Sequence, residues 1–246
     1  SGPGGTAFIG GAQLTNESAY AWAKLAKSVV GTDHVDAQLG DGLPAALVAS
    51  LPRATIDEAC AAGGTILTIG TDPKDELPVL FLRLRDAVTR GGASIIELAA
   101  APTSLTDLAS HSLRIRPGAV NELVEQIIAG EGELGALRDQ LASGPFTVVL
   151  GRPSIAESAE AAVAAAVALR DAFDGVTFLS ALRRANTHGA IDMGLSPGML
   201  PGHVALDDGR SWYADAWGEL PEAAGLDTAG ILEAAASGHV DTLVLL

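Results

Sequence analysis

A short loop after an apolar run carries residues that could bind a phosphate. The stretch TILTIGTDPKDELP, residues 65–78, has the pattern of a buried strand, a glycine turn and a helix start. A glycine after a buried strand lets the backbone turn at the carboxyl edge of a sheet, where free N–H groups favour an anion. Alternatively, Asp72 and Pro73 simply cap and start a helix. Spacing favours this plain turn, because the loop contains no G-x-G-x-x-G or G-x-x-x-x-G-K-[ST] motif and Asp72 would repel a pyrophosphate.

The other reactive side chains are scattered along the chain. Cys60, the single cysteine, lies among acidic neighbours that would raise its thiol pKa, which favours a structural thiol over a nucleophile. The histidines form no H-E-x-x-H or other ligand pair and are interpreted as surface or hydrogen-bonded residues. They are His34, His111, His188, His203 and His239.

A polar segment near residue 185 leaves two interpretations open. The stretch RRANTHGAIDMG combines Arg183, Arg184 and Asn186 with two glycines. This composition suits a loop that binds a substrate or an anion. It suits equally a surface turn or a contact with another subunit. From the residues alone, the chain has no intact catalytic constellation.

The elements that must position these residues alternate along the chain. Apolar runs of strand length alternate with helical patterns, which predicts βαβ units and a parallel sheet. Strands are expected at residues 6–10, 65–70, 93–99, 113–116, 146–151, 176–180 and 241–246. Helices are expected within residues 15–30, 55–62, 75–90, 119–130, 131–144, 154–173 and 228–240, with 131–144 read as a helix or a linker. A loop-rich stretch is expected from Arg183 to Trp217.

Composition narrows the class of protein. The 246 residues are 48% hydrophobic, which is enough for one large domain or two smaller ones. A formal charge of -15 argues against general nucleic-acid binding and a polybasic membrane anchor. One cysteine excludes an intrachain disulfide, a four-thiolate iron–sulfur site and a zinc site built on paired cysteines. No apolar run approaches the roughly 20 residues of a membrane span, so a soluble protein without direct membrane insertion is expected.

Several segments, in order, resemble one known family. They are GGAQLTNESAYAWAKLAKSVVGTDHVDAQLGDGLP, TILTIGTDPKDELPVLFLRLRDAVTRGGA, LRIRPGA, RRANTHGAIDMGLSPGMLPG and GHVDTLVLL. Together they cover nearly the whole chain and look like the molybdopterin oxidoreductase superfamily. More narrowly, they resemble the large iron–sulfur subunit, the G subunit, of bacterial NADH:quinone oxidoreductase, respiratory complex I. The opening GTAFIGG and the closing DTLVLL also suggest an internal fragment of a longer protein.

The resemblance implies a fold and a setting. The implied fold is α/β, with two Rossmann-like parallel-sheet units, one inserted in the other. By that analogy residues 1–38 and 143–246 form one unit and residues 39–142 the insert. Iron–sulfur clusters are expected in an N-terminal part outside this chain. The implied partners are other subunits of the peripheral arm of complex I, at the cytoplasmic face of the inner membrane.

The departures from the family pattern indicate a lost cofactor. Active molybdenum enzymes of the superfamily usually have G-S-N-P where this chain has Gly70, Thr71, Asp72 and Pro73. After the next strand they typically have Asp-Pro-Arg, which contacts the nucleotide end of the pterin, and here residues 99–101 are all alanine. These replacements describe a vestigial pterin-nucleotide loop.

The guanine contact of the family is also changed. Where active enzymes have R-P-G-T-D, this chain keeps Arg116, Pro117 and Gly118 but continues with Ala119 and Val120. An alanine and a valine cannot supply the charged hydrogen bonds that hold a guanine. The resemblance therefore implies no catalytic residue, no bound molybdopterin and a scaffold role.

Two other functions compete with the scaffold. One is the catalytic subunit of a molybdenum or tungsten enzyme such as formate dehydrogenase, with Asp41 as a conceivable molybdenum ligand in QLGDGLP. A turn-forming aspartate before Gly42 is the simpler interpretation of Asp41. The other is a nucleotide-binding domain that uses the Gly70 loop as a simple anion site.

Overall fold

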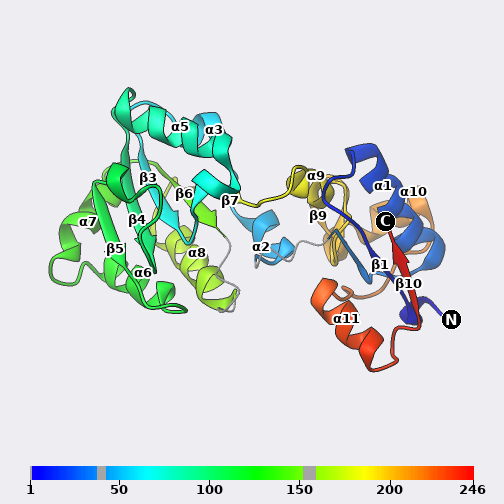
Figure 1. Ribbon diagram of the computed structural model, residues 1–246. Helices are drawn as coiled ribbons and strands as arrows, with labels where there is room; N and C mark the ends of the chain where they lie inside the picture. The colour runs from blue at the N-terminus through cyan, green and yellow to red at the C-terminus, as the bar shows by residue number, and fades with distance from the viewer. Residues whose placement is uncertain (1, 38–42, 152–158) are drawn as a thin grey trace. The chain divides into compact units, whose positions relative to one another are not determined.

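The chain folds into two compact units. The computed structural model describes residues 2–37, 43–151 and 159–246 (Figure 1). The first unit consists of Ser1–Ala49 with Arg184–Leu246, and the second of Ser50–Arg183. The second unit is therefore inserted in the first, which confirms the predicted arrangement of one α/β unit within another.

The inserted unit is built on a five-stranded parallel sheet. Its order is β5-β4-β3-β6-β7. The strands are β3 (Thr65–Ile69), β4 (Ser94–Ala99), β5 (His111–Arg114), β6 (Phe146–Gly151) and β7 (Thr177–Ala181). The chain moves outward from β3 to one edge and then returns beside β3 to build the other half. In such doubly wound sheets, the reversal point leaves a crevice at the carboxyl ends of the strands.

Helices cover this sheet because its strands are apolar along their whole length. All six residues of β6 are buried, as expected for a central parallel strand. On one side, Leu80 and Leu84 of α5 pack with Ile66 and Ile95 of the sheet. The helical elements of the unit are α3 (Ile56–Ala59), α4 (Pro73–Glu76), α5 (Pro78–Thr89), η3 (Thr106–Leu108), α6 (Val120–Ala129), α7 (Leu134–Ala142) and α8 (Glu160–Ala172).

The boundary between the units differs from the sequence-based division. That division placed residues 143–183 with the N-terminal segment. In the structure, β6 pairs with β3 from Thr65↔Phe146 to Ile69↔Leu150, and β7 pairs with β6. Residues 146–181 thus complete the inserted sheet, and the chain returns to the first unit at Arg184. The similar strand patterns of the two halves concealed this pairing, because strand partners are not encoded locally.

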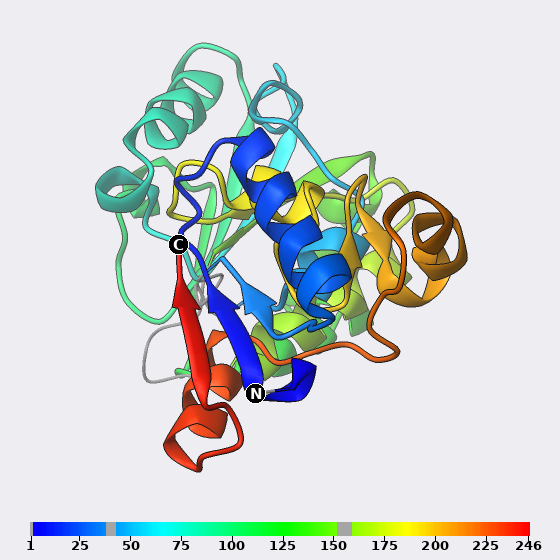
Figure 2. The ribbon, with the colours of Figure 1, turned by 90° about the vertical axis from the view of Figure 1, so that its right-hand side faces the viewer.

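The first unit contains a three-stranded parallel sheet of order β10-β1-β2, seen in Figure 2. Its strands are β1 (Thr6–Ile9), β2 (Val35–Asp36) and β10 (Thr242–Leu245). Phe8 meets Trp22 of α1 with ring centroids 6.4 Å apart. The neighbours of Phe8 in β1, Ala7 and Ile9, pack with Ile231 of α11. Since successive side chains of a strand point to opposite faces, α1 and α11 cover the two faces of this sheet.

The remaining elements of the first unit complete its shell. The helices are η1 (Pro3–Gly5), α1 (Asn16–Lys24), its π-helical continuation η2 (Leu25–Val30), α9 (Thr187–Asp192), α10 (Leu206–Trp217) and α11 (Thr228–Ala236). A hairpin is formed by β8 (Met199–Leu200) and β9 (Val204–Ala205), and α2 (Ala45–Ser50) lies where the chain leaves this unit. In the described ranges, no helix is both long and apolar enough to cross a membrane.

Helix α10 is the main element that the sequence pattern did not predict. The expected loop from Arg183 to Trp217 contains α9, the hairpin and this 12-residue helix. Its only buried residues are Leu206 and Gly209, so it lacks a broad apolar stripe. A Cβ on Gly209 would lie 2.8 Å from Val204 Cγ1, so glycine allows the helix to pack directly on the hairpin. Glycine has a low helix propensity, but Gly209 stabilises α10 because it lets the helix contact the hairpin.

Candidate functional site

The predicted anion loop lies at the reversal point of the inserted sheet. Gly70 follows β3 with a φ of 59°, and its N–H donates to Leu98 O at 3.2 Å. A Cβ on Gly151, at the end of β6, would be 2.5 Å from Thr71 Cβ. The turn after β3 is therefore packed tightly against the ends of β4 and β6.

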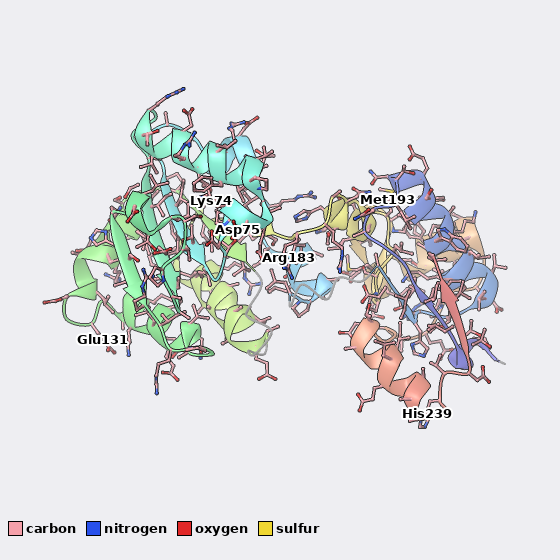
Figure 3. All side chains as sticks on the ribbon, in the orientation of Figure 1. Lys74, Asp75, Glu131, Arg183, Met193 and His239 are labelled. Carbon is pink, nitrogen blue, oxygen red and sulfur yellow. The ribbon has the colours of Figure 1, made fainter. Side chains whose placement is uncertain are left out.

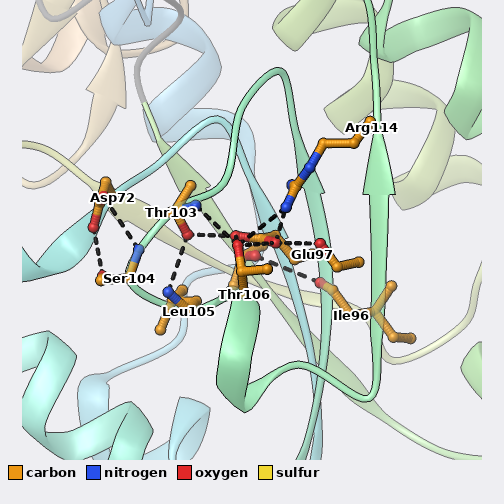
Figure 4. Close-up of polar contacts among 10 residues, drawn as sticks. Asp72, Ile96, Glu97, Thr103, Ser104, Leu105, Thr106 and Arg114 are labelled. Carbon is orange, nitrogen blue, oxygen red and sulfur yellow. Dashed lines mark hydrogen bonds and ion pairs between the residues drawn. The ribbon is translucent and has the colours of Figure 1, made fainter.

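Asp72 holds two loops together at this sheet edge. As the N-cap of α4, its Oδ1 accepts a hydrogen bond from Lys74 N at 3.3 Å. The same carboxylate accepts bonds from Ser104 Oγ at 2.5 Å and Ser104 N at 3.2 Å (Figure 4). Asp72 thus caps the helix, as the plain-turn interpretation proposed, and also ties it to the loop after β4.

A buried carboxylate organises the loop after β4. The Glu97 side chain is 1% exposed and accepts bonds from four side chains (Figure 4). Thr106 Oγ1 donates at 2.9 Å, Ser112 Oγ at 2.5 Å and Arg114 Nη1 at 3.2 Å, and Thr103 Oγ1 donates as well. We call Glu97 with these four donors the Glu97 cluster. Its members come from β4, from β5 and from the connection between them.

The Glu97 cluster keeps its carboxylate ionised. Burial opposes the charge and by itself raises the pKa of Glu97. The hydrogen bonds from Ser112, Thr103, Thr106 and Arg114 outweigh burial, so the pKa of Glu97 lies below its ordinary value. The ionised Glu97 carboxylate therefore holds β4, β5 and the connection between them together. Residues 99–101 lie within this segment.

The resemblance aligns residues 99–101 and 116–120 with the nucleotide-binding residues of active molybdenum enzymes. The structure shows where these residues lie. Ala99 is buried at the end of β4, while Ala100 and Ala101 are exposed. The Arg116 side chain is 84% exposed and lies 3.5 Å from the exposed carboxylate of Glu122. Gly118 has a φ of 78° and precedes α6, whose first residue, Val120, is buried.

These residues do not fit the nucleotide end of a molybdopterin. The carboxylate of Asp72 already accepts bonds from Ser104 and would oppose a pyrophosphate. Alanines at 99–101 offer no side-chain donor or acceptor, and the valine at position 120 cannot pair with a guanine.

The segment RRANTHGAIDMG forms α9 and the turn before it. Asn186 Nδ2 donates to Leu14 O at 2.7 Å and to Asn16 Oδ1 at 2.9 Å, which joins α9 to the start of α1. Arg183 Nη1 lies 3.1 Å from Glu76 Oε1 within the inserted unit (Figure 3 labels Arg183). The two arginines, which flank the division between the units, also make contacts of their own. Of the two interpretations, the structural turn has the direct support of Asn186.

The cysteine and the histidines do not form a common site with one another among the described residues. Burial raises the pKa of the Cys60 thiol, and the nearby Asp57 adds to this increase. His34 Nδ1 accepts a bond from Leu226 N at 3.0 Å, and His203 Nδ1 lies 2.9 Å from Asp192 Oδ1. In the part of the chain that the structure describes, no three His, Cys, Asp or Glu side chains gather closely enough to hold a metal. Asp41 lies outside the described residues.

The first unit contains a buried ion pair that sequence reasoning missed. Lys27, on η2, is fully buried, pairs with Asp33 and donates to Ser196 O at 3.0 Å. Asp33 Oδ2 accepts bonds from Gly198 N at 2.6 Å and Gly225 N at 2.7 Å. Burial lowers the pKa of the Lys27 ammonium and Asp33 opposes that shift. The sequence did hold one sign of this ion pair. Lys27 lies one position after Ala26, on the apolar side of the predicted helix, where a charged side chain needs a buried partner.

Comparison with known proteins identifies relatives over nearly the full length. No family model matches the chain. It is 32% identical to the G subunit of the NADH-quinone oxidoreductase of Mycobacterium tuberculosis, over 98% of this chain and 30% of that protein. Its identity to the corresponding G subunit of Streptomyces coelicolor is also 32%, over 98% of this chain and 32% of that protein. The chain thus spans about a third of the length of the curated relatives it matches.

A solved structure shows the same fold. The formyltransferase/hydrolase complex (FhcABCD) from Methylorubrum extorquens, in complex with methylofuran, aligns with a TM-score of 0.59. The alignment covers 97% of this chain and 67% of that chain, at 15% sequence identity. At this identity the likeness concerns the fold alone.

Proposed function

We propose that this chain, a homologue over 98% of its length of the G subunit of NADH-quinone oxidoreductase, is a cofactor-free scaffold segment of such a subunit. The observation that carries the proposal is the sheet edge of the inserted unit. There, Asp72 is bonded to Ser104 and the Glu97 cluster fixes the next loop. The edge is organised by internal hydrogen bonds where active relatives would need cationic and amide contacts to a nucleotide.

The scaffold belongs, in this proposal, to a complex that passes electrons from NADH to quinone. The chain contributes no electron carrier of its own, because one cysteine cannot ligate an iron–sulfur cluster. Clusters are placed in another part of the full-length subunit. The partners are the other subunits of the peripheral arm, and the location is the cytoplasmic face of the inner membrane.

Metal analysis of the full-length subunit tests the proposal. The complex is purified with the subunit intact, and molybdenum and tungsten are measured by mass spectrometry beside pterin fluorescence after oxidation. We expect both metals and the pterin to be far below one per subunit, with NADH:quinone activity present. Stoichiometric metal with a pterin signal would contradict the cofactor-free role.

Two variants sharpen this test, one in the loop after β3 and one at the conceivable metal ligand. Asp72→Asn supplies the amide that the resembled family has at this position. We expect the variant to remain free of pterin, because residues 99–101 still offer no side-chain contacts. Asp41→Ala is the second variant. If metal is found in the wild-type subunit and lost in Asp41→Ala, a molybdenum or tungsten enzyme replaces the scaffold as the better description.

A further inference from the structure

A ladder of aromatic rings crosses the first unit and ends at an exposed tryptophan. Tyr20 of α1 meets Trp217 of α10 with ring centroids 5.5 Å apart. Trp217 meets Tyr213 at 5.0 Å, and Tyr213 meets Trp212 at 4.7 Å, each with nearly perpendicular rings. Edge-to-face pairs of this kind stabilise packing. The ladder thus links Trp212, through Tyr213 and Trp217 of the same helix, to Tyr20 of α1.

The exposure of Trp212 is not explained by the packing of the unit. Its side chain is 67% exposed, whereas Tyr213, next to it, is anchored by a hydrogen bond from its hydroxyl to Pro201 O at 2.6 Å. A large aromatic side chain left in water forgoes the free energy of burial, about 2 kcal/mol or more for a side chain of this size. Exposed tryptophans on rigid elements are enriched at the centres of protein interfaces.

Two carboxylates flank this tryptophan along the helix. Asp208 lies four positions before Trp212 and Asp215 three positions after it, so both are neighbours of the indole on the helix surface. Both are exposed, and neither makes a hydrogen bond or an ion pair with any other residue that the structure describes. We call Asp208, Trp212 and Asp215 the Trp212 face.

Arg210 of α10 and Lys24 of α1, two cations on the helices that carry the ladder, have other contacts. Arg210 Nη2 donates to Asp207 Oδ1 at 2.7 Å and to Glu222 O at 2.5 Å. Lys24 Nζ lies 5.8 Å from the ring centroid of Trp217, further along the ladder. That contact shows the ladder already using one ring as a platform for a cation, while the more exposed indole of Trp212 has none among the described residues.

We propose that the Trp212 face binds an arginine-bearing segment of another subunit. A guanidinium can stack on an indole while its N–H groups bind a carboxylate three or four positions away on the helix. An apolar partner would leave Asp208 and Asp215 desolvated without a counter-charge, which is costly. A nucleic acid or an anionic membrane would be repelled by a chain of formal charge -15. This inference rests on the proposed role of the chain as part of a multi-subunit complex.

A peptide titration tests the chemistry of the Trp212 face. The 246-residue chain is titrated with a synthetic helical peptide that carries three arginines at four-residue spacing, and with the same peptide in which lysine replaces arginine. We expect the arginine peptide to bind more tightly. Trp212→Ala should weaken it about five-fold, and Asp208→Asn with Asp215→Asn by a similar factor at low salt. Anisotropy of a dye on the peptide reports binding independently of the tryptophans.

A charge-matched variant controls for general attraction to an acidic protein. Glu125→Gln with Asp174→Asn removes two exposed carboxylates of the inserted unit, and should leave the affinity within about two-fold if binding is localised. If Trp212→Ala binds as the wild type does, or if both double variants weaken binding equally, the proposal is overturned. Equal affinity for the two peptides would also contradict it.

Photo-crosslinking in the assembled complex then tests the partner. A photoreactive phenylalanine analogue replaces Ala216, an exposed residue one turn after Trp212 on α10, in the full-length subunit, and the crosslinked peptide is identified by mass spectrometry. A peptide with an arginine near the crosslink supports the inference. A complex that assembles but yields a crosslink to a segment without arginine, or none, overturns it and leaves the proposed function intact. A subunit that assembles with no oxidoreductase subunits at all contradicts the proposed function instead.

Discussion

Each of the two units buries a carboxylate, and different groups replace the water that each carboxylate loses. Glu97 of the inserted unit is held by hydroxyls and one arginine that lie within 17 residues of it in sequence. Asp33 of the first unit is held by Lys27 and by backbone N–H groups of Gly198 and Gly225, the last 192 residues away. One network is local and borders the surface, and the other joins distant segments in the interior.

The difference indicates two roles for buried charge. The Lys27–Asp33 pair connects the part of the first unit that precedes the insertion to the part that follows it, so it holds that unit together. The Glu97 cluster shapes a single loop at the sheet edge, where the Arg114 side chain is still 37% exposed. Breaking the first should therefore cost more stability than breaking the second.

The largest effect is expected from Lys27→Met. It leaves the Asp33 charge buried without its counter-ion, which should lower the free energy of unfolding by about 3–5 kcal/mol. Urea denaturation followed by circular dichroism measures the change. Lys24→Met, a lysine on the preceding turn that contacts Trp217, should cost less than about 1 kcal/mol. Similar losses for the two variants would show that burial of the Lys27–Asp33 pair does not make it more important for stability than an exposed lysine.

A double variant sharpens this result. Asn at position 33 keeps an acceptor for the N–H groups of Gly198 and Gly225 but carries no charge. Lys27→Met with Asp33→Asn should therefore be more stable than Lys27→Met alone. If the second substitution only adds a further loss, the unpaired charge is not the source of the first.

Glu97→Ala should have the next largest effect. It removes the acceptor of four donors and should cost about 1–3 kcal/mol, since these hydroxyls and Arg114 can partly turn to water. The same denaturation experiment applies, with Glu122→Ala as the control. Glu122 pairs with Arg116 at an exposed site, so its loss should cost less than about 1 kcal/mol. A Glu97→Ala variant as stable as this control would contradict the interpretation of the cluster.

The Glu97 cluster should also make stability depend on pH in the acid range. The pKa of Glu97 is below the ordinary value of 4.5 in the folded chain, so at acid pH the unfolded chain binds more protons at this site. Its contribution is complete above the unfolded pKa and is lost as pH falls through the folded pKa. The stability difference between wild type and Glu97→Gln should accordingly shrink between about pH 6 and pH 3. A difference that stays constant over this range would exclude the linkage.

The smallest effect is expected from Asp72→Asn. Asparagine also caps helices and keeps one acceptor for Ser104, so stability should change by less than about 1 kcal/mol. Thermal unfolding of the variant measures this. A loss comparable to that of Glu97→Ala would show that the charge of Asp72, and not only its hydrogen bonds, holds the two loops together.

Much of the fold followed from local patterns. Apolar runs and helix signals predicted β3, α5 and β4 in order, and Gly70 marked the turn between the first two. The capping role of Asp72 was one of the stated alternatives. Helix α10 was missed because Gly209 and scattered polar residues hide a helix that is stabilised by contact with the hairpin.

The sequence by itself determined the α/β class, the order of the main strands and helices of the inserted unit, and the residue types at Asp72 and at positions 99–101. Tertiary structure decided which strands are partners, and so moved residues 146–181 into the inserted unit. It also decided which charges meet, bringing Lys27 to Ser196 and Asp33 to Gly225. The physical reason is the sequence distance over which each effect acts. Hydrophobic periodicity and helix capping involve residues a few positions apart. The partners that stabilise a buried charge can come from any part of the chain.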